Sequence, residues 1–350
     1  MKMLFWILGI FFFALIIFIA WASYPWSISE NKIQGEVKHI DPEVMVNNEE
    51  NPSVIKILTW NLSYLYGEGS EGGSYQHKDK NYYQEKLNQL AAEIQEWQPD
   101  IICLQEVDFN SFRSGGINQV EFLGLKAGYP YIAEAVSWQA NYIPFPYWPV
   151  SNHFKAVESG GAILSKYPIL SHEYLLLAKP QSHPWWYNLF YLHRYFQKVT
   201  LEVGSKKFNL INLHLEAFDK NNRQEQIKML IKKIEKEKID LVAGDFNMVP
   251  KNATKRSKFA NNDDYENDLS AELMSQSALL EVIPDEIYDK NEAFYFTFPA
   301  THPDRRLDYI FYRKDLKMMK AEVLSSALSD HLPIRATFQI DSPKFNPYSL

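Results

Sequence analysis

Polar side chains that can bind metal ions or move protons recur where short apolar segments of this sequence end. Asn61, Glu106 and His214 each follow such a segment. Further along the chain, the same arrangement brings Asp245, Asn247, Asp308, Asp330 and His331 to the ends of apolar segments. A hard divalent cation binds oxygen ligands, and hydrolysis of a phosphoester needs both charge stabilisation and proton transfer. These residue types therefore predict metal-assisted hydrolysis.

Each of these residues also has an ordinary structural role when it is considered alone. Asn61 and Asp245 can stabilise turns at strand ends, and Glu106 can belong to a solvated loop. His214 and His331 can be core histidines with satisfied hydrogen bonds. A purely structural explanation must, however, supply the needed residue type at every one of these strand ends. The functional interpretation is favoured by the whole set and not by any single member.

The apolar segments have the composition of β-strands. Short runs rich in Val, Ile and Leu predict strands at 54–60, 101–104, 161–164, 197–203, 207–213, 239–243, 307–312 and 332–338. Apolar residues recur at helical spacing in 87–97 and again in 227–234, and the Asn-, Asp- and Lys-rich segment 251–268 predicts a surface loop. We therefore expect a mixed α/β protein in which strand ends on one side meet at a common edge.

Six short motifs occur in an order that resembles a known family. They are Thr-Trp-Asn at 59–61, Leu-Gln-Glu at 104–106, Asn-Leu-His-Leu-Glu at 212–216, Gly-Asp-Phe-Asn at 244–247, Arg-Leu-Asp-Tyr at 306–309 and Ser-Asp-His-Leu-Pro at 329–333. With the strand-and-turn sequence at 160–169, they resemble the endonuclease/exonuclease/phosphatase superfamily, which includes deoxyribonuclease I-like and neutral sphingomyelinase-like phosphoesterases. The resemblance extends over about residues 54–338. One such motif is moderate evidence, whereas six in the family's order are strong evidence.

The resemblance implies a fold and a metal site. The expected fold is α/β, a four-layer α/β/β/α sandwich of two packed mixed β-sheets flanked by helices, preceded here by one N-terminal transmembrane helix. Asn61, Glu106 and Asp330 resemble the residues that bind Mg²⁺ in this family, with Mn²⁺ or Ca²⁺ as substitutes. Carboxylate and amide oxygens are suitable ligands for such ions.

The resemblance also implies catalytic roles. His331 is expected to be the catalytic imidazole, oriented by Asp308. Asp245 would position or deprotonate the attacking water, and Asn247 would hold that water or a phosphoryl oxygen. His214 would donate a hydrogen bond to the phosphate or the leaving group. The sequence leaves open whether His331 or Asp245 removes the proton.

Residues 3–22 form an uncharged apolar segment. Twenty helical residues extend about 30 Å, the thickness of the hydrocarbon core of a bilayer. Lys2 precedes the segment, and Trp21, Tyr24 and Trp26 lie at its far end, as interfacial aromatic residues do. We expect a single-pass anchor with a cytoplasmic N-terminus and an extracytoplasmic catalytic domain. A cleaved signal peptide, which would make the protein secreted or periplasmic, is the alternative.

The sequence divides into four segments. They are the anchor or signal peptide at 1–26, a polar tether at 27–53, the catalytic domain at 54–340 and a C-terminal tail at 341–350. The tether is assigned from its polar and irregular composition. Cys103 is the single cysteine of the chain and cannot form an intramolecular disulfide. Its apolar neighbours predict a buried strand position.

Composition and charge limit the substrate. The 350 residues include 36 Lys and Arg against 43 Asp and Glu, a net charge of −7, and 46% are hydrophobic. This composition excludes a disordered chain. The acidic balance provides little long-range attraction for polyanions, which disfavours nucleic acid. An exported metal-dependent nuclease is still the main alternative, because Arg113, Arg223, Arg305 and Arg306 can supply a local basic surface.

Two aromatic segments, at 129–148 and 185–196, suit a surface that contacts lipid headgroups or the packing of an insertion onto the sandwich. Segment 312–328 lacks the aromatic hairpin of related sphingomyelinases, and 301–306 only loosely resembles the phosphoinositide phosphatase pattern. We expect a phosphoester substrate, lipid or nucleic acid, contact with the membrane through residues 3–22, and no obligate protein partner. An inactive binding module is disfavoured because Glu106, Asp245 and His331 are all present.

Overall fold

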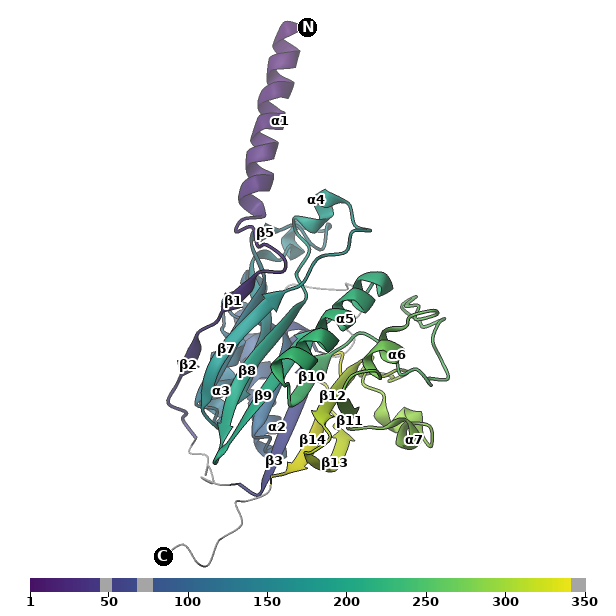
Figure 1. The fold of residues 1–350 in the computed structure, drawn as a ribbon. Coiled ribbons are helices and arrows are strands. Elements are labelled where there is room, and N and C mark those ends of the chain that lie inside the picture. Colours follow the sequence, from purple (N-terminus) through teal and green to yellow (C-terminus); the bar gives the residue numbers. More distant parts are fainter. Residues whose placement is uncertain (45–51, 68–77, 341–350) are drawn as a thin grey trace, which may run out of the picture.

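The computed structural model describes residues 1–44, 52–67 and 78–340, which form an N-terminal apolar helix and a two-sheet sandwich (Figure 1). Residues 45–51 of the predicted tether and the predicted tail at 341–350 lie outside the described residues.

The first sheet contains seven strands in the described part of the chain. Their spatial order is β13 (Lys317–Val323), β14 (Ile334–Gln339), β3 (Val54–Asn61), β4 (Ile101–Asp108), β6 (Lys155–Ser165), β5 (Tyr131–Ile143) and β2 (Val37–His39). β3 and β4 are parallel, and the other neighbouring pairs are antiparallel. The connection between β3 and β4 includes helix α2 (Lys80–Trp97), because parallel strands require a long crossover.

The second sheet also has seven strands among the described residues. Their order is β1 (Lys32–Gln34), β7 (Ile169–Leu176), β8 (Tyr195–Val203), β9 (Lys206–His214), β10 (Leu241–Asp245), β12 (Asp308–Arg313) and β11 (Leu279–Glu281). It too has one parallel pair, β9 and β10, connected through helix α5 (Lys220–Glu237). Each sheet therefore carries a parallel pair at its centre and antiparallel strands toward its edges.

Helices cover the outer face of each sheet. α2 and α3 (Gln119–Ala127) pack on the first sheet through a cluster that includes Leu87 and Leu123, and α5 packs on the second through Ile227 and Leu230. Shorter elements lie in the connections: α4 (Trp185–Asn188), α6 (Ser270–Met274), α7 (Asp285–Tyr288), η1 (Ser63–Leu65), η3 (Phe112–Ser114), η4 (Val150–Asn152) and η5 (Glu292–Tyr295). The predicted four-layer α/β/β/α sandwich is confirmed (Figure 1).

The eight predicted strands are all present, with bounds that differ by a few residues. Segment 251–268, predicted to be a surface loop, has no helix or strand among its residues, all of which are described. Outside the tether, the sequence did not predict β5, β7, β11 and β13. β5 lies in the first aromatic segment, and β13 is an edge strand whose mostly half-exposed residues show no clear apolar alternation.

Alternation of side chains along the strands explains both the core and the position of the site. In β3, Ile55 and Ile57 belong to the cluster between the sheets, whereas Leu58 and Trp60 belong to the cluster under α2. Because successive side chains point to opposite faces, Asn61 continues the inner row. The same period puts Gln105, Asn212, His214, Asp245 and Asp308 on inner faces at the site end of their strands.

A buried amide network joins the two sheets next to the site. Gln105 of the first sheet donates from Nε2 to Asn212 Oδ1 at 2.7 Å, and Asn212 donates from Nδ2 to Gln197 Oε1 at 2.9 Å. All three side chains are fully buried. Unpaired amides would be costly here, so this chain of hydrogen bonds helps to fix how the two sheets align at this end.

Helix α1 (Lys2–Ala22) extends away from the sandwich (Figure 1) and is apolar on all sides, with a mean hydropathy of 2.9 in its most apolar window. None of that window is buried inside the protein. A helix that exposes apolar side chains all round is stable in a membrane and not in water. α1 is thus long and apolar enough to cross a membrane, as a transmembrane anchor or a signal sequence is.

The segment predicted to be a polar tether departs from that prediction over residues 32–39. β1 pairs with β7 of the second sheet, and β2 pairs with β5 of the first. The segment therefore crosses one edge of the sandwich and adds a strand to each sheet. Three-residue strands are too short to produce an alternating pattern in the sequence, and they form because distant edge strands offer free backbone groups.

Candidate active site

The second sheet places three predicted site residues side by side. Asp245 pairs in register with His214 of β9 on one side and with Asp308 of β12 on the other. His214 Nε2 lies 3.3 Å from Asp245 Oδ2. All three face the first sheet, in which β3 ends at Asn61 and β4 carries Glu106 near its end. The structure therefore brings five of the predicted residues together from two sheets.

Glu106 reaches this site because β4 is irregular at this position. Strict alternation would turn Glu106 to the outer face, since Gln105 faces inward. The pairing of β4 with β6 instead shifts register between Leu104 and Val107, and Glu106 has a φ of +52°. Such a bulge re-aims a side chain, and the left-handed backbone costs about 1–3 kcal/mol at a non-glycine residue. The carboxylate ends 3.8 Å from His214 Nε2.

The Gly-Asp-Phe-Asn motif makes a tight end to β10. A Cβ at Gly244, where φ is +151°, would lie 2.1 Å from the Leu213 carbonyl oxygen, so only glycine allows β9 and β10 to approach this closely. Phe246 is buried in the cluster under α5. Asn247 donates its backbone N–H to Asp245 Oδ1 at 2.9 Å and its amide to Asp245 Oδ2 at 3.3 Å. The motif thus fixes the orientation of the Asp245 carboxylate.

Asn61 connects the two carboxylates of the site. Its Nδ2 donates to Asp245 Oδ2 at 2.9 Å and to Glu106 Oε1 at 3.3 Å. Its Oδ1 accepts the backbone N–H of Ser63 at 2.9 Å, which holds the amide in this orientation. One neutral side chain therefore holds Glu106 and Asp245 close together.

His331 is held by a buried carboxylate. Its Nδ1 donates to Asp308 Oδ2 at 2.8 Å, and its Nε2 lies 3.9 Å from Asp245 Oδ2. Burial acts to lower the pKa of His331, but the charges of Asp308 and Asp245 outweigh burial and raise the pKa to about 10. The imidazole is therefore a cation at neutral pH, with its Nε2–H directed toward the centre of the site.

Burial raises the pKa of two carboxylates of the site, Asp245 and Glu106. It raises the pKa of Asp245 to about 6, with a smaller contribution from Asp308, while the charge of His331 opposes the shift. Burial also raises the pKa of Glu106, against the charges of Arg194 and His331. An acid that is ionised near neutral pH and still basic enough to accept a proton is what general base catalysis requires.

Arg194 belongs to the site although no sequence pattern singled it out. Its Nη1 lies 2.5 Å from His214 Nε2. Because a guanidinium only donates, His214 Nε2 accepts this hydrogen bond. Burial lowers the pKa of His214 well below its usual value, and the charge of Arg194 lowers it further. Neutral His214 therefore has no proton on Nε2, and the expected donation to the phosphate cannot come from this nitrogen.

An ion pair with Glu216 holds Arg194 in place, and Tyr191 in turn hydrogen-bonds Glu216. Glu216 Oε2 lies 3.7 Å from Arg194 Nε, and Tyr191 donates its hydroxyl to Glu216 Oε1 at 2.9 Å. The Glu216 side chain is fully buried. The single sequence signal for Arg194 is its position before β8, whose Tyr195 pairs in register with His214.

Asp330 lies in the loop that carries His331. The hydroxyl of Ser329 donates to Asp330 Oδ1 at 3.4 Å, and the carbonyl of Asp330 accepts the backbone N–H of Ala300 at 2.7 Å. Its charge adds to the rise in the pKa of His331. Asp330 is therefore a half-buried residue at the rim of the site, and its role as a metal ligand stays a prediction.

The four arginines considered for a basic nucleic-acid surface are buried in ion pairs. Their partners are Asp108 for Arg113 and Asp268 for Arg223, both at 2.8 Å, Asp263 and Asp304 for Arg305, and Glu281 for Arg306. Each arginine is at most 3% exposed. These side chains stabilise the fold and do not form an accessible basic surface.

The donor atoms of the site fit a divalent cation. Asp245, Asp308 and His331 offer ligand atoms that all lie within 4.8 Å of one another. Asp308 Oδ1 is buried without a hydrogen-bond partner among the described residues. Carboxylates with raised pKa values, gathered around one amide, are stabilised by a cation, and Mg²⁺ prefers such oxygens. Glu106 is the carboxylate best placed to hold it, because Asp308 already accepts a hydrogen bond from His331 and Asn61 directs its Nδ2, which is not a metal ligand, toward Glu106 and Asp245.

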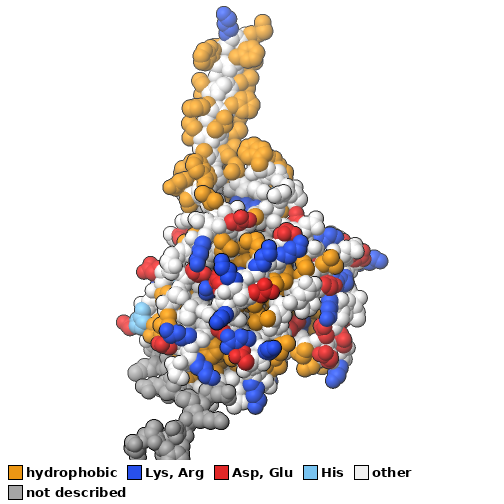
Figure 2. Space-filling model, in the orientation of Figure 1, with side chains coloured by type: hydrophobic (Ala, Val, Ile, Leu, Met, Phe, Trp, Pro, Cys, Tyr) orange, Lys and Arg blue, Asp and Glu red, His pale blue; other side chains and the backbone are white. Residues whose placement is uncertain are grey.

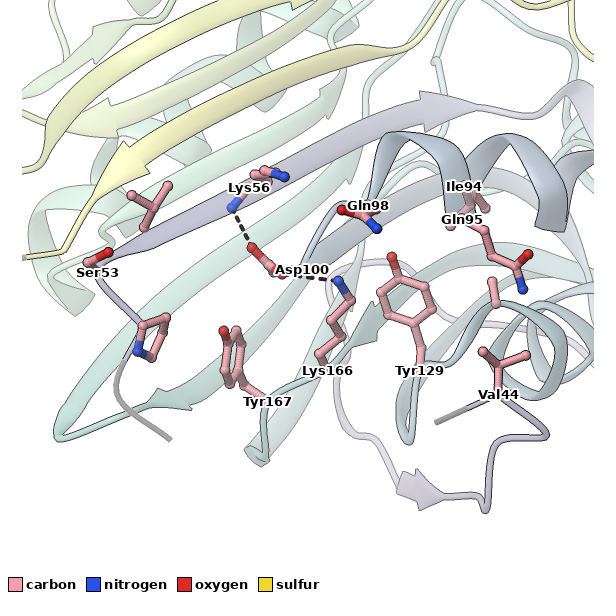
Figure 3. Close-up of a pocket in the computed structure, with 13 residues that line it drawn as sticks. Val44, Ser53, Lys56, Ile94, Gln95, Gln98, Asp100, Tyr129, Lys166 and Tyr167 are labelled. Atoms are coloured by element: carbon pink, nitrogen blue, oxygen red, sulfur yellow. Dashed lines mark hydrogen bonds and ion pairs between the residues drawn. The ribbon is translucent and has the colours of Figure 1, made fainter. Parts of the chain in front are cut away.

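A large cavity of about 670 Å³ lies at the opposite end of the sandwich (Figure 3). There Asp100 accepts the backbone N–H of Lys56 at 2.8 Å and the ammonium of Lys166 at 3.1 Å. β3 runs from this cavity to Asn61, a distance of about 25 Å at the usual rise per residue. Asp100 is the single carboxylate among its described lining residues, so this cavity lacks the groups that hydrolysis needs.

The protein has two packed mixed sheets, and acid, amide and imidazole groups lie at their shared end. This arrangement is that of two-sheet phosphoesterases. The chain belongs to the Endonuclease/Exonuclease/phosphatase family, whose model matches residues 58–331. Members of this family are hydrolases that act on phosphoester bonds. No curated protein matches the sequence.

Solved structures confirm the fold. An endonuclease/exonuclease/phosphatase from Beutenbergia cavernae has a TM-score of 0.61 at 18% identity, over 83% of this chain and 72% of that chain. A humanized D. rerio TDP2 has a TM-score of 0.54 at 18% identity, over 83% of this chain and 100% of that chain. A mannosyl-6-phosphatase from Bacteroides thetaiotaomicron has a TM-score of 0.53 at 15% identity, over 82% and 100%. At these identities the likeness extends to the fold and not to the substrate.

Proposed function

We propose that the protein is a metal-dependent phosphoester hydrolase that uses Mg²⁺, with Mn²⁺ or Ca²⁺ as substitutes. The observation that carries the proposal is the buried cluster in which Asp308 holds His331 beside Asp245 and Glu106. Within it, one carboxylate has a pKa of about 6 and one imidazole a pKa of about 10. Environments that push the pKa values of neighbouring groups apart are the mark of an acid and base pair.

In this proposal Asp245 is the general base and His331 the cationic acid. At neutral pH Asp245 is ionised, and it takes a proton from the attacking water. His331, still protonated, donates from Nε2 to a phosphoryl oxygen or to the leaving group as negative charge develops there. The bound cation would neutralise charge on the phosphoryl oxygens. The sequence left open which residue removes the proton from water, and this proposal assigns that role to Asp245.

The remaining polar residues position these groups. Asn61 and Asn247 orient the Asp245 carboxylate through the hydrogen bonds described above. Arg194, held by Glu216, keeps His214 neutral and adds a positive charge next to Glu106. A guanidinium beside the site can also contact a phosphoryl oxygen, because it presents several donors in one plane.

The proposed location is at the membrane, with α1 as a single-pass anchor, the N-terminus in the cytoplasm and the catalytic domain outside it. Lys2 before α1 and the aromatic residues after it support this orientation. If α1 is removed as a signal peptide, the domain is secreted or periplasmic. Cysteine accessibility to a membrane-impermeant reagent, at an engineered exposed position such as Ser205→Cys, tests the sidedness.

The proposed substrate is a lipid or another small phosphoester. Nucleic acid is the second candidate, but the burial of Arg113, Arg223, Arg305 and Arg306 removes the basic surface on which that candidate depended. The net charge of −7 supports the same choice.

The test is hydrolysis by the full-length protein in detergent, with and without chelator. The substrates are p-nitrophenyl phosphate, bis(p-nitrophenyl) phosphate, phospholipid vesicles and supercoiled plasmid. Asp245→Asn should abolish every Mg²⁺-dependent rate, whereas Asp315→Asn, an exposed carboxylate paired with Arg313, should not. Nicking of the plasmid alone would favour the nuclease. Absence of hydrolysis of all four substrates would favour a binding module.

A further inference from the structure

An aromatic groove lies beside the active site and plays no part in the chemistry described so far. It encloses about 370 Å³ between the end of β5, the connection from β5 to β6, and the segment around α4. Trp138, Phe145, Phe154, Trp186 and Phe190 are among its lining residues, and charged side chains are absent from its described lining. A pocket of this size and polarity fits an apolar ligand.

The groove lies next to the C-terminal end of α1. Asn141 of β5 donates from Nδ2 to the Trp21 carbonyl at 3.0 Å and from its backbone N–H to the Tyr24 carbonyl at 2.9 Å. The rings of Tyr142 and Phe18 contact each other, with centroids 5.9 Å apart. These contacts, with the pairing of β1 and β2 to the sheets, hold α1 and the domain in one orientation. Figure 1 shows α4 beside the end of α1.

Exposed aromatic side chains surround the entrance. Trp148 is 81% exposed, Tyr147 67%, Trp185 75% and Trp186 55%. Figure 2 shows hydrophobic side chains gathered at the end of the domain from which α1 extends. Trp and Tyr are the residues that prefer the headgroup region of a bilayer. If α1 crosses the membrane, this face of the domain therefore rests on the lipid surface.

Two sets of side-chain contacts connect the wall of the groove to the catalytic groups. Tyr191, which lines the groove, donates to Glu216, and Glu216 supports the Arg194 that bonds His214. On the other side, Trp138 contacts Tyr64, with ring centroids 6.4 Å apart. The charge of Glu106 adds to the burial that raises the pKa of Tyr64, so these two side chains are close. The groove is thus adjacent to the residues that position the catalytic groups, and it shares part of its wall with them.

We propose that the groove binds an acyl chain of a membrane lipid whose phosphoester enters the active site. The proposal rests on the proposed function, because it names the substrate class of that same site. A lipid chain suits this groove because its lining carries no charged side chain and because it lies between a membrane anchor and a phosphoester site. Each methylene buried in it should strengthen binding about three- to fourfold.

The first test does not depend on catalysis. Full-length protein is placed in nanodiscs of phosphatidylethanolamine and phosphatidylglycerol that contain a phospholipid with a photoactivatable diazirine midway along one acyl chain. After irradiation, peptide mass spectrometry should locate cross-links in residues 138–154 and 186–192 in addition to α1. Cross-links confined to α1 would overturn the proposal, as would equal labelling after Trp186→Asp and Phe218→Asp, which place charges in the groove lining.

The second test separates the groove from the catalytic centre. Phosphoesters with acyl chains of four to twelve carbons are hydrolysed by the full-length protein in detergent, and bis(p-nitrophenyl) phosphate is measured alongside. KM should fall with chain length in the wild type by at least tenfold over the series, and Trp186→Asp should flatten this dependence. Trp185→Ser changes a more exposed neighbour that does not line the groove, and this variant should keep the dependence.

The outcomes are distinguishable. Hydrolysis of bis(p-nitrophenyl) phosphate, together with a KM for the acyl phosphoesters that is independent of chain length, overturns the groove and leaves the proposed function intact. Loss of the dependence in both tryptophan variants assigns the effect to general contact of the exposed aromatic residues with the micelle and also overturns the groove. Absence of any hydrolysis overturns the proposed function, while cross-linking within the groove still decides whether a lipid chain binds there.

Discussion

Asp308 Oδ2 lies 2.8 Å from His331 Nδ1, and both side chains are buried between the two sheets. Asp308 is the first residue of β12, and His331 lies in the loop before β14, so the pair joins the second sheet to the first. The same loop is held from the first sheet, because Ser329 donates its hydroxyl to the Asn61 carbonyl at 2.7 Å. The hydrogen bond fixes which imidazole nitrogen faces Asp245.

Replacing Asp308 by Asn should impair catalysis through His331. The amide keeps the size of the carboxylate but removes the charge that raises the pKa of His331. We expect kcat to fall about 10²- to 10⁴-fold, the usual range for loss of an acid or base function. The alkaline limb of the pH–rate profile should also move to lower pH. An unchanged limb would show that Asp308 acts only in packing, and Asp315→Asn is the control.

The pH dependence of kcat/KM should be bell-shaped. Asp245, with a pKa of about 6, must be deprotonated to accept a proton, so activity should be lost as pH falls through about 6. His331, with a pKa of about 10, must be protonated to donate, so activity should be lost as pH rises toward 10. The two limbs report the coupled pair and not isolated groups. Measurements at constant ionic strength and free Mg²⁺ decide this, and His331→Gln should remove the alkaline limb.

Much of this site follows from sequence reasoning because strand alternation is a local property. Asn61 and Asp245 are polar residues at the ends of apolar strands, and the period of two already places them on the inner faces. The fold class follows for the same reason, from apolar strands separated by helical patterns. Glu106 was found from its motif alone, since alternation by itself would have turned it outward.

The residues that sequence reasoning missed depend on contacts between distant segments. Arg194 bonds His214, 20 residues further along the chain, across the β8–β9 hairpin, but it lies before the predicted strand 197–203 and in none of the motifs. The burial of Arg113 and Arg306 depends on partners that the fold supplies, so their type alone suggested an accessible charge. β1 was hidden for a related reason, because three residues cannot display a period.

Asn61→Ala should weaken the use of Mg²⁺ without unfolding the protein. The amide joins Glu106 to Asp245, and removing it leaves two carboxylates without their shared donor. We expect the Mg²⁺ concentration for half-maximal rate to rise about 10- to 100-fold, as for other residues that orient metal ligands. A matched control is Asn209→Ala, whose side chain pairs with Thr200 outside the site. Coincident Mg²⁺ titrations of Asn61→Ala and the wild type would contradict the assignment.

Arg194→Lys should show whether the guanidinium acts through its geometry. Lysine keeps the positive charge near Glu106 but cannot present the planar donors that bond His214. Loss of one positioned donor typically costs about 10²- to 10³-fold in rate, and we expect kcat/KM to fall in that range. Arg313→Lys, on the surface beside Asp315, should leave turnover unchanged. Wild-type kcat/KM in Arg194→Lys would mean that charge alone is needed there.

Arg113→Met should destabilise the protein and leave nucleic-acid affinity unchanged. Arg113 and Asp108 are fully buried partners 2.8 Å apart, and the guanidinium stacks on Tyr64 at 3.6 Å from the ring centre. Removing one member of a buried pair costs about 3–5 kcal/mol, because the other charge is left without compensation. Urea unfolding of the full-length protein should therefore show a lower midpoint, and the double substitution Arg113→Met with Asp108→Asn should recover part of the loss. An unchanged midpoint together with weaker DNA binding would instead identify Arg113 as an accessible contact and revive the nuclease alternative.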